Sequence, residues 1–156
     1  TRAEEYKAVI TVPYTPGTLR AEAIDEQGNP IPSMNTGHNT LRTAGTPYAI
    51  RLVADRTAIQ ANNQDLSFIT VEVVDKNGVV CPNAADELTA TLSGRGVLAA
   101  FGNADIKELG CTVDNEHNVW KGRALAVVRS TYRRGNAVLT ITGKGLKPAK
   151  VVIKTK

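Results

Sequence analysis

Aromatic side chains are scarce in this sequence of 156 residues. One Trp, two Phe and four Tyr make up 4% of the chain. Proteins that bind single-stranded nucleic acid stack bases on several aromatic rings, and dedicated carbohydrate-binding sandwiches present such rings to sugars. The scarcity therefore argues against both classes.

Long apolar runs are also missing. No stretch approaches the roughly 20 residues that a membrane-spanning helix requires, and the N-terminal segment TRAEEYKAV lacks the apolar core of a signal peptide. We therefore expect no membrane insertion, and the sequence carries no direct sign of export. We also expect a fragment of a longer protein, because the chain starts in a charged segment without an initiating Met.

Acidic residues are absent from the last part of the chain. Residues 121–156 hold ten Lys or Arg, whereas residues 1–120 hold nine together with all fifteen Asp and Glu. Such a basic segment can bind nucleic acid. The terminal sequence KPAKVVIKTK nevertheless alternates lysines with Val151 and Ile153, which is typical of a solvated strand protected by lysines. We therefore expect a strand here and no nucleic-acid partner.

Cysteine is limited to Cys81 and Cys111, which lie thirty residues apart. Neither belongs to a CxxC pair or a cysteine–histidine ladder, so the sequence supports no zinc site and no redox motif. We expect two structural thiols, with a disulfide between them as the alternative. No motif for a cofactor is present.

Helical periodicity is almost absent, and short β-branched runs separated by Gly, Pro, Asn and Asp take its place. This pattern predicts an all-β fold, an immunoglobulin-like antiparallel β-sandwich with a partial smaller β module at the N-terminus. In LSFITVEVV, Ile69, Val71 and Val73 should face the core, with Thr70 and Glu72 opposite. The predicted strands are 7–12, 18–24, 48–54, 66–74, 87–92, 97–101, 124–130, 137–143 and 149–155.

One short pattern occurs twice. AEAIDEQGNPIPS aligns with VEVVDKNGVVCPN fifty residues later, so that Asp25 matches Asp75 and Gly28 matches Gly78. An Asp in such a turn accepts hydrogen bonds from backbone N–H groups, and the Gly supplies a positive φ. The repeat therefore predicts equivalent strand and turn units in two successive β modules.

The turn-rich stretch Ala44-Gly-Thr-Pro47 marks the predicted domain boundary. Residues 47–156 supply about seven strands, which is the size of one immunoglobulin-like sandwich. Residues 1–46 supply only about three, too few for a stable independent fold. We therefore expect a partial module over residues 1–46 that packs on the second domain or lacks preceding strands.

Three segments together resemble a known family. They are VPYTPGTLRAEAID (12–25), the long stretch from LRTAGTPYAIRLV to NGVVCPNA (41–84) and WKGRALAVVRST (120–131). They are similar to the C-terminal β-sandwich region of family 2 glycoside hydrolases, especially the β-galactosidase-like enzymes of Bacteroidetes. The resemblance spans nearly the whole chain. Invasin-type adhesin repeats, which also carry a strand, a D-x-x-G turn and a proline, are the nearest confusable family.

The resemblance implies a non-catalytic accessory region of a carbohydrate-degrading enzyme. In that family, two glutamates of a (β/α)8 barrel perform the chemistry, and a barrel of about 250 residues cannot fit in this chain. No catalytic residue is therefore transferred. The implied partners are the catalytic and other domains of the parent enzyme. The implied location is the periplasm or the cell surface, as for a secreted protein.

Two polar stretches, FGNADIKE (101–108) and DNEHNVWKG (114–122), are the remaining candidates for a binding site. Their side chains provide oxygen ligands, amides and one aromatic platform, which a carbohydrate or calcium site uses. The calcium-loop pattern is absent, so no metal is expected. The structural alternative is a solvated loop tip with Trp120 in the core and His117 as an isolated loop histidine. The candidate residues are Asn103, Asp105, Asp114, Glu116, His117 and Trp120.

Nucleophilic chemistry has little support in the sequence. GxSxG is absent, and neither histidine has a nucleophile at a recognisable spacing. Gly94-Arg-Gly96 and Gly143-Lys-Gly145 are explained as hairpin turns. Three hypotheses remain: an accessory region of a glycoside hydrolase, a carbohydrate-binding module and an adhesin repeat.

Overall fold

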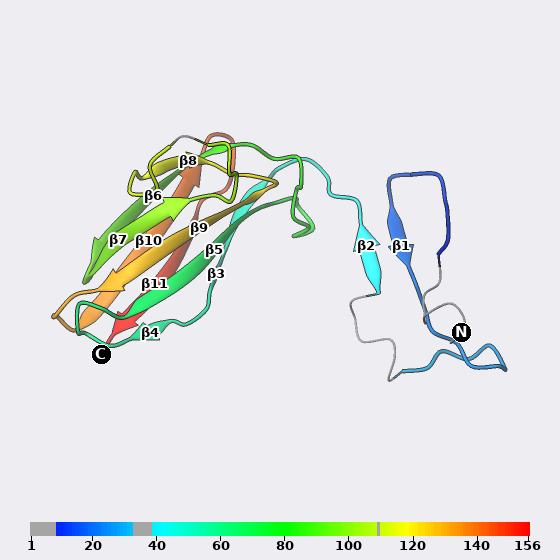
Figure 1. Ribbon diagram of the computed structural model, residues 1–156, viewed down its shortest axis with the longest axis horizontal. Coiled ribbons are helices and arrows are strands. Elements are labelled where there is room, and N and C mark those ends of the chain that lie inside the picture. The colour runs from blue at the N-terminus through cyan, green and yellow to red at the C-terminus, as the bar shows by residue number, and fades with distance from the viewer. Residues whose placement is uncertain (1–8, 33–38, 109) are drawn as a thin grey trace. The chain divides into compact units, whose positions relative to one another are not determined.

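The computed structural model describes residues 9–32, 39–108 and 110–156 (Figure 1). The chain divides into two compact units, Thr1–Thr43 and Ala44–Lys156. All regular elements in the described ranges are strands. No helix in these ranges is long and apolar enough to cross a membrane.

The first unit contains one small antiparallel pair. Strand β1 (Thr18–Arg20) pairs with β2 (Thr40–Arg42), so that Leu19 lies opposite Leu41. The Gly17 N–H donates to Thr43 Oγ1 at 3.0 Å, which continues the pairing. Both leucines are exposed, and none of the buried core residues belongs to this unit among the residues described.

Two strand predictions in this unit were wrong. Residues 9–12 of the predicted strand 7–12 are irregular, while residues 7 and 8 lie outside the described ranges. The predicted strand 18–24 ends at Arg20, and β2 was not predicted. High β-propensity produces a strand only where a neighbouring strand completes the ladder and one face is buried, and residues 9–12 have neither.

The second unit is a two-layer sandwich. A four-stranded sheet has the order β3-β5-β9-β7, and a five-stranded sheet has the order β4-β11-β10-β6-β8. All pairs are antiparallel except the short parallel contact between β4 and β11. The strands are β3 (Ala49–Ala54), β4 (Ala58–Ile59), β5 (Leu66–Val74), β6 (Glu87–Gly94), β7 (Gly96–Gly102), β8 (Glu116–Asn118), β9 (Arg123–Ser130), β10 (Gly135–Gly143) and β11 (Ala149–Thr155).

The predicted all-β sandwich is thus confirmed, and the seven strands expected after residue 47 are all present. The bounds of β5 and β11 agree with the prediction residue for residue. The short strands β4 and β8 were missed. Both have too few residues to display alternation, which is the signal that identifies strands in a sequence.

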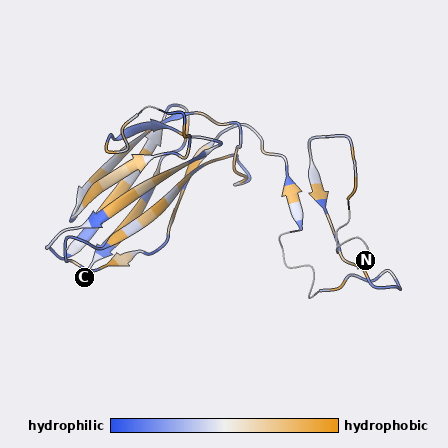
Figure 2. Cartoon of the chain, in the orientation of Figure 1, coloured by the Kyte–Doolittle hydropathy of each residue, from blue (hydrophilic) through white to orange (hydrophobic). Residues whose placement is uncertain are grey.

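The core lies between the two sheets of the sandwich. Ile69, Val71 and Val73 have no exposed surface, as the alternation in β5 predicted. Phe101 from β7 and Leu139 from β10 are equally buried. Figure 2 shows orange bands interspersed with white and blue ones along the strands of the sandwich, as expected where only one face of each strand is buried. Each fully buried side chain of this size stabilises the fold by roughly 1.5–3 kcal/mol relative to an exposed one.

The repeated pattern forms the same turn twice. Asp25 Oδ1 accepts hydrogen bonds from the N–H groups of residues 27 and 29, and Asp75 Oδ1 accepts them from residues 77 and 79. Gly28 and Gly78 follow with φ angles of 85° and 77°, which glycine adopts without strain. The repeat is therefore structural, and each aspartate stabilises its own turn.

Candidate functional site

The short strand β8 organises the polar loop region in which the candidate residues lie. It pairs with β6, with His117 opposite Leu88. The His117 ring is buried and meets Phe101 edge to face, with ring centroids 5.9 Å apart. Its Nε2 donates to the Cys111 carbonyl oxygen at 2.9 Å, and its Nδ1 lies 3.3 Å from Glu108 Oε1. His117 therefore anchors the preceding loop to the sandwich.

The expectation of an isolated loop histidine was wrong. Side chains alternate across β8, so His117 points into the sandwich while Glu116 and Asn118 point outward. Glu116 Oε1 accepts from Thr89 Oγ1 at 3.4 Å on that outer face. Glu116 and His117 thus lie on opposite sides of the sheet and do not converge on one ligand.

Asn103 and Asp105 are engaged in the backbone of their own loop. Asn103 Nδ2 donates to the Asn118 carbonyl oxygen at 2.7 Å, which joins this loop to the end of β8. Asn103 Oδ1 accepts from the Asp105 N–H at 2.7 Å, and Asp105 Oδ1 accepts from the Lys107 N–H at 3.0 Å. These amide and carboxylate groups therefore stabilise the conformation of the loop through hydrogen bonds that a sugar ligand would have to replace.

Asp114 is exposed in the turn before β8, where its N–H donates to the Cys111 carbonyl oxygen at 3.0 Å. Among the described residues, no group of three or more His, Cys, Asp or Glu side chains is arranged to hold a metal ion. Cys81 is buried and Cys111 is exposed, and both are free thiols.

Trp120 is partly exposed, at 38% of its surface, so its assignment to the core was wrong. It pairs with Arg123 across a two-residue turn in which Lys121 and Gly122 have φ angles of 52° and 74°. Positive φ at both central positions is typical of a type I′ hairpin turn. The turn places Trp120 at the rim of the sandwich, where Lys121 Nζ lies 4.5 Å from the ring centroid. Lys121 therefore covers part of the exposed face of the Trp120 ring.

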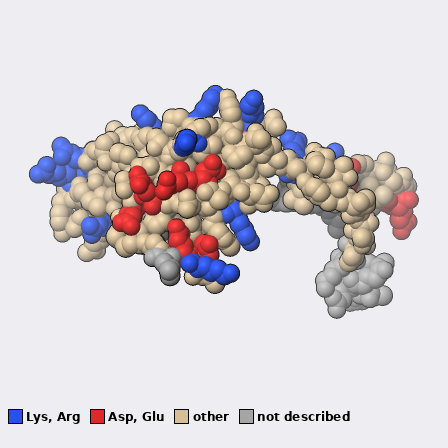
Figure 3. All heavy atoms as spheres, turned by 90° about the horizontal axis from the view of Figure 1, so that it is seen from above, with Lys and Arg blue, Asp and Glu red and all other residues tan. Residues whose placement is uncertain are grey.

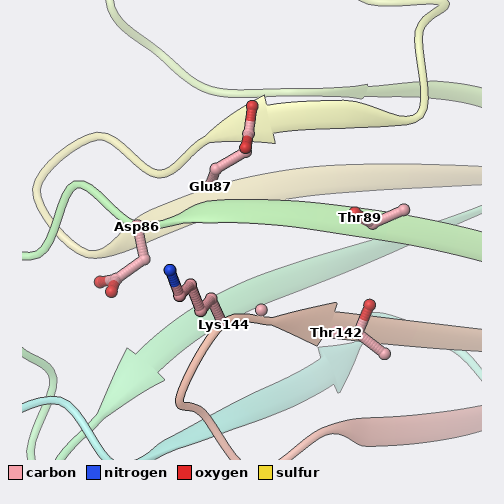
Figure 4. Close-up of a pocket in the computed structure, with 6 residues that line it drawn as sticks. Asp86, Glu87, Thr89, Thr142 and Lys144 are labelled. Carbon is pink, nitrogen blue, oxygen red and sulfur yellow. The ribbon is translucent and has the colours of Figure 1, made fainter.

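A separate depression of about 510 Å³ lies where the start of β6 meets the end of β10 (Figure 4). Antiparallel pairing of these strands brings Thr89 opposite Thr142 and Leu88 opposite Gly143. The carboxylates of Asp86 and Glu87 point in different directions in Figure 4. A retaining glycosidase requires two carboxyl groups about 5–5.5 Å apart across a cleft. The lining residues are Asp86, Glu87, Thr89, Thr142, Gly143 and Lys144.

Sequence reasoning missed this depression. Its six residues come from two segments more than fifty positions apart, and only the register of β6 against β10 joins them. The adjacent acids Asp86 and Glu87 were the only local signal, and they are equally typical of a solvated strand start.

The family described as glycoside hydrolase family 2 C-terminal domain 5 matches residues 50–152. The beta-galactosidase BoGH2A of Bacteroides ovatus is 33% identical over 138 residues, which are 88% of this chain and 16% of that protein. A solved glycosyl hydrolase family 2 member from Bacteroides cellulosilyticus is 34% identical with a TM-score of 0.86, covering 98% of this chain and 20% of that one.

A beta-glycosidase from Bacteroides vulgatus has a similar structure, at 25% identity and a TM-score of 0.80 over 92% of this chain and 18% of that one. The chain thus spans one fifth or less of the length of each of these three relatives. The matched segment is a C-terminal part of family 2 enzymes, as the name of the matching family states.

Proposed function

Because the chain belongs to the glycoside hydrolase family 2 C-terminal domain 5 family, we propose that it is a non-catalytic accessory domain of a β-galactosidase-like enzyme. In this role it supports the catalytic part of the enzyme structurally during carbohydrate degradation. Its partners are the catalytic domain and the other domains of the same polypeptide. The proposed location is the periplasm or the cell surface.

One observation carries this proposal. The chain aligns over 88% of its length with only 16% of a named beta-galactosidase. A catalytic barrel of the (β/α)8 type needs about 250 residues, so in such a protein the chemistry belongs to the remaining polypeptide. The family match also favours this interpretation over an adhesin repeat, which was the third hypothesis from the sequence.

The sandwich has the properties that a structural support requires. Its core is continuous between the two sheets and includes residues from eight of its nine strands, and polar side chains such as Asn103 and His117 attach its longest loop. A rigid domain attached to a larger one stabilises it by the free energy of their contact, because unfolding either must break that contact.

Deletion of the domain from the longer enzyme tests the proposal. We expect removal of residues 44–156 to leave KM for an aryl β-galactoside within twofold and to shorten the half-life of activity on heating at least severalfold. A matched control keeps the domain and carries Thr91→Ser, a mild change on an outer strand face. Unchanged thermal inactivation after the deletion would contradict the proposed supporting role.

Carbohydrate binding remains a second candidate, because Trp120 is partly exposed at the rim. An exposed indole can stack on the apolar face of a sugar. If the exposed loop side chains of Asp114 and Glu116 bind oligosaccharides next to Trp120, titration should change the fluorescence of this single tryptophan, and Trp120→Ala should abolish binding. Lys121→Ala, which uncovers the ring, serves as the control that keeps the platform. If the chain binds none of the sugars on a glycan array, carbohydrate binding is excluded.

A further inference from the structure

The outer face of the four-stranded sheet is apolar. Phe68 in β5 lies one diagonal step from Val53 in β3 and from Leu125 in β9, because Thr70 pairs with both of the latter. Val53, Phe68 and Leu125 are 51%, 41% and 43% exposed, although their side chains are large and apolar. Val97 in β7 continues this surface at 39%. These four residues define the apolar face.

The other sheet of the same domain has a different outer face. Thr89 and Thr91 of β6 lie beside Thr142 and Thr140 of β10, and β11 follows with lysines. Val152 is 48% exposed there, but its neighbours on the same face of β11 are Lys150 and Lys154. Hydroxyl, ammonium and carboxylate groups therefore dominate this face, because Glu116 of β8 also lies on it beside Thr89. Figure 3 shows Asp and Glu side chains close together on the sandwich, with Lys and Arg side chains spread around them. The five-stranded sheet forms a stable layer of the same sandwich with a polar outer face. The fold therefore does not require an apolar outer face, and the exposed apolar residues of the four-stranded sheet need another explanation.

Positive charge borders the apolar face. Glu72 is held between two arginines: its Oε2 accepts from Arg51 Nε at 2.8 Å, and its Oε1 accepts from Arg123 Nε at 3.2 Å. Arg129 lies at the opposite end, and its Nε is buried without a hydrogen-bond partner among the described residues. Arg56 and Asp55, whose Oδ1 accepts from the Phe68 N–H, add a further ion pair at the border, so four arginines and two acids leave a net charge of +2. A complementary surface would be apolar at its centre and acidic at its rim.

We propose that the apolar face is the docking surface for another domain of the longer enzyme, one that presents an apolar centre rimmed by carboxylates. This inference rests on the proposed function. The chain accounts for only 16–20% of two of its relatives, so further domains make up most of each of those polypeptides. A second copy of this chain fits less well, because two such faces would bring their arginines together.

The size of the face agrees with an interface inside one polypeptide. Four strands about 4.8 Å apart, each contributing six residues that rise about 3.3 Å, cover roughly 380 Å², which is the outer face of the whole sheet, with the apolar face and its arginine border together. Counting both partners, this lies within the range of about 600–1,500 Å² for contacts between domains of one chain. Such a contact needs little intrinsic affinity, because the connecting chain keeps the partner at a high local concentration.

Hydroxyl-radical footprinting tests the proposal, because the oxidation rate of a side chain reports its access to solvent. We expect Phe68 and Leu125 to be oxidised at least threefold more slowly in the longer enzyme than in this chain alone, while Val152 changes by less than 1.5-fold. Protection of Val152 without protection of Phe68, or no protection on either sheet, would overturn the proposed docking surface.

A charge substitution on the apolar face provides a second test of the docking surface. Phe68→Glu adds an unpaired charge where the partner is apolar and acidic, so heat should inactivate the longer enzyme at least severalfold faster; Val152→Glu on the other sheet should change the rate by less than twofold. Unfolding of each variant of this chain alone, followed by Trp120 fluorescence, shows whether the sandwich itself remains stable. If deletion of residues 44–156 accelerates inactivation and Phe68→Glu does not, the docking surface is wrong while the supporting role stands.

Analytical ultracentrifugation of this chain alone tests whether a second copy of the chain binds the apolar face. We expect a monomer at micromolar concentration. A dimer that Phe68→Glu dissociates and Val152→Glu does not would overturn the proposal, since the face would then bind a second copy.

Discussion

Asp75 joins two distant parts of the sandwich domain through one carboxylate oxygen: its Oδ2 accepts a hydrogen bond from the Gly45 N–H at 2.8 Å, thirty residues earlier in the chain. Its Oδ1 accepts from the N–H groups of Asn77 and Val79 at 2.8 and 2.9 Å. The matching Asp25 makes the same local turn. The sequence repeat therefore identifies the turn. The additional hydrogen bond from Gly45 attaches the first residues of the sandwich domain to that turn.

Substitution of Asp75 by Asn should destabilise the sandwich. An amide has one accepting oxygen, so its NH2 group would face an N–H donor, either that of Gly45 or those of the turn. An unsatisfied buried donor destabilises a fold. We expect a lower melting temperature, measured by the fluorescence of Trp120, which lies in the same domain.

Asp114→Asn is the matched control for this substitution, because Asp114 is an exposed aspartate in the loop before β8. It removes the same charge and should leave the melting temperature within about 1 °C, as most surface substitutions do. Equal effects of the two substitutions would mean that net charge, and not the bond to Gly45, accounts for the loss.

Acid should destabilise the sandwich through its turn carboxylates. The N–H groups of Gly45 and Val79 lower the pKa of Asp75, and the Gln60 N–H lowers the pKa of Asp65 in the same way. A carboxylate with a lowered pKa stabilises the fold fully above its unfolded value of 3.8, and this stabilisation is lost as the pH falls through the folded-state pKa. We expect the free energy of unfolding in urea to fall between pH 5 and pH 2, with a smaller decrease for Asp75→Asn than for Asp114→Asn. Equal decreases in the two variants would contradict this account.

Truncation of a core side chain should cost much more than truncation of an exposed one. Ile69 has no exposed surface and lies between the sheets, so Ile69→Ala should lower the free energy of unfolding by about 2–5 kcal/mol. Val152→Ala, on the outer face of β11, should lower it by less than about 1 kcal/mol. Urea unfolding followed by circular dichroism measures both, and similar losses would place Ile69 outside the core.

The two cysteines should differ in reactivity. Cys111 is exposed, whereas burial raises the pKa of the Cys81 thiol and keeps reagents away from it. In the folded protein, a disulfide reagent such as DTNB should react quickly with Cys111 and slowly with Cys81. Cys111→Ser should remove the fast phase. Absence of any reaction until a reductant is added would indicate a disulfide instead.

The alternation of apolar and polar residues in the sequence was enough to predict most strands of the sandwich. In β5 and β11 it extends over seven to nine residues and identifies both the strand and its buried face. It fails for β8, whose three polar residues show no pattern, although His117 in its middle is buried. Leu88 opposite and the ring of Phe101 create the environment of His117, and neither is a neighbour in sequence.

The candidate site was less predictable than the fold. Trp120 suggested a core residue because tryptophan is large and apolar, but the positive φ angles of Lys121 and Gly122 place it at the rim. The apolar face was not predicted, since Phe68 and Leu125 are ordinary strand residues until the sheet order β3-β5-β9-β7 places them together. Sheet order depends on long-range pairing, which local pattern does not encode.

We propose that this chain supports an enzyme without performing its chemistry. The most direct test measures hydrolysis of p-nitrophenyl β-galactoside by the purified chain, with the longer enzyme assayed beside it. We predict that the chain alone releases nitrophenol at the rate of buffer, while the longer enzyme turns it over. A rate proportional to the concentration of the chain, and abolished by Asp86→Asn or Glu87→Gln at the depression between β6 and β10, would contradict the account.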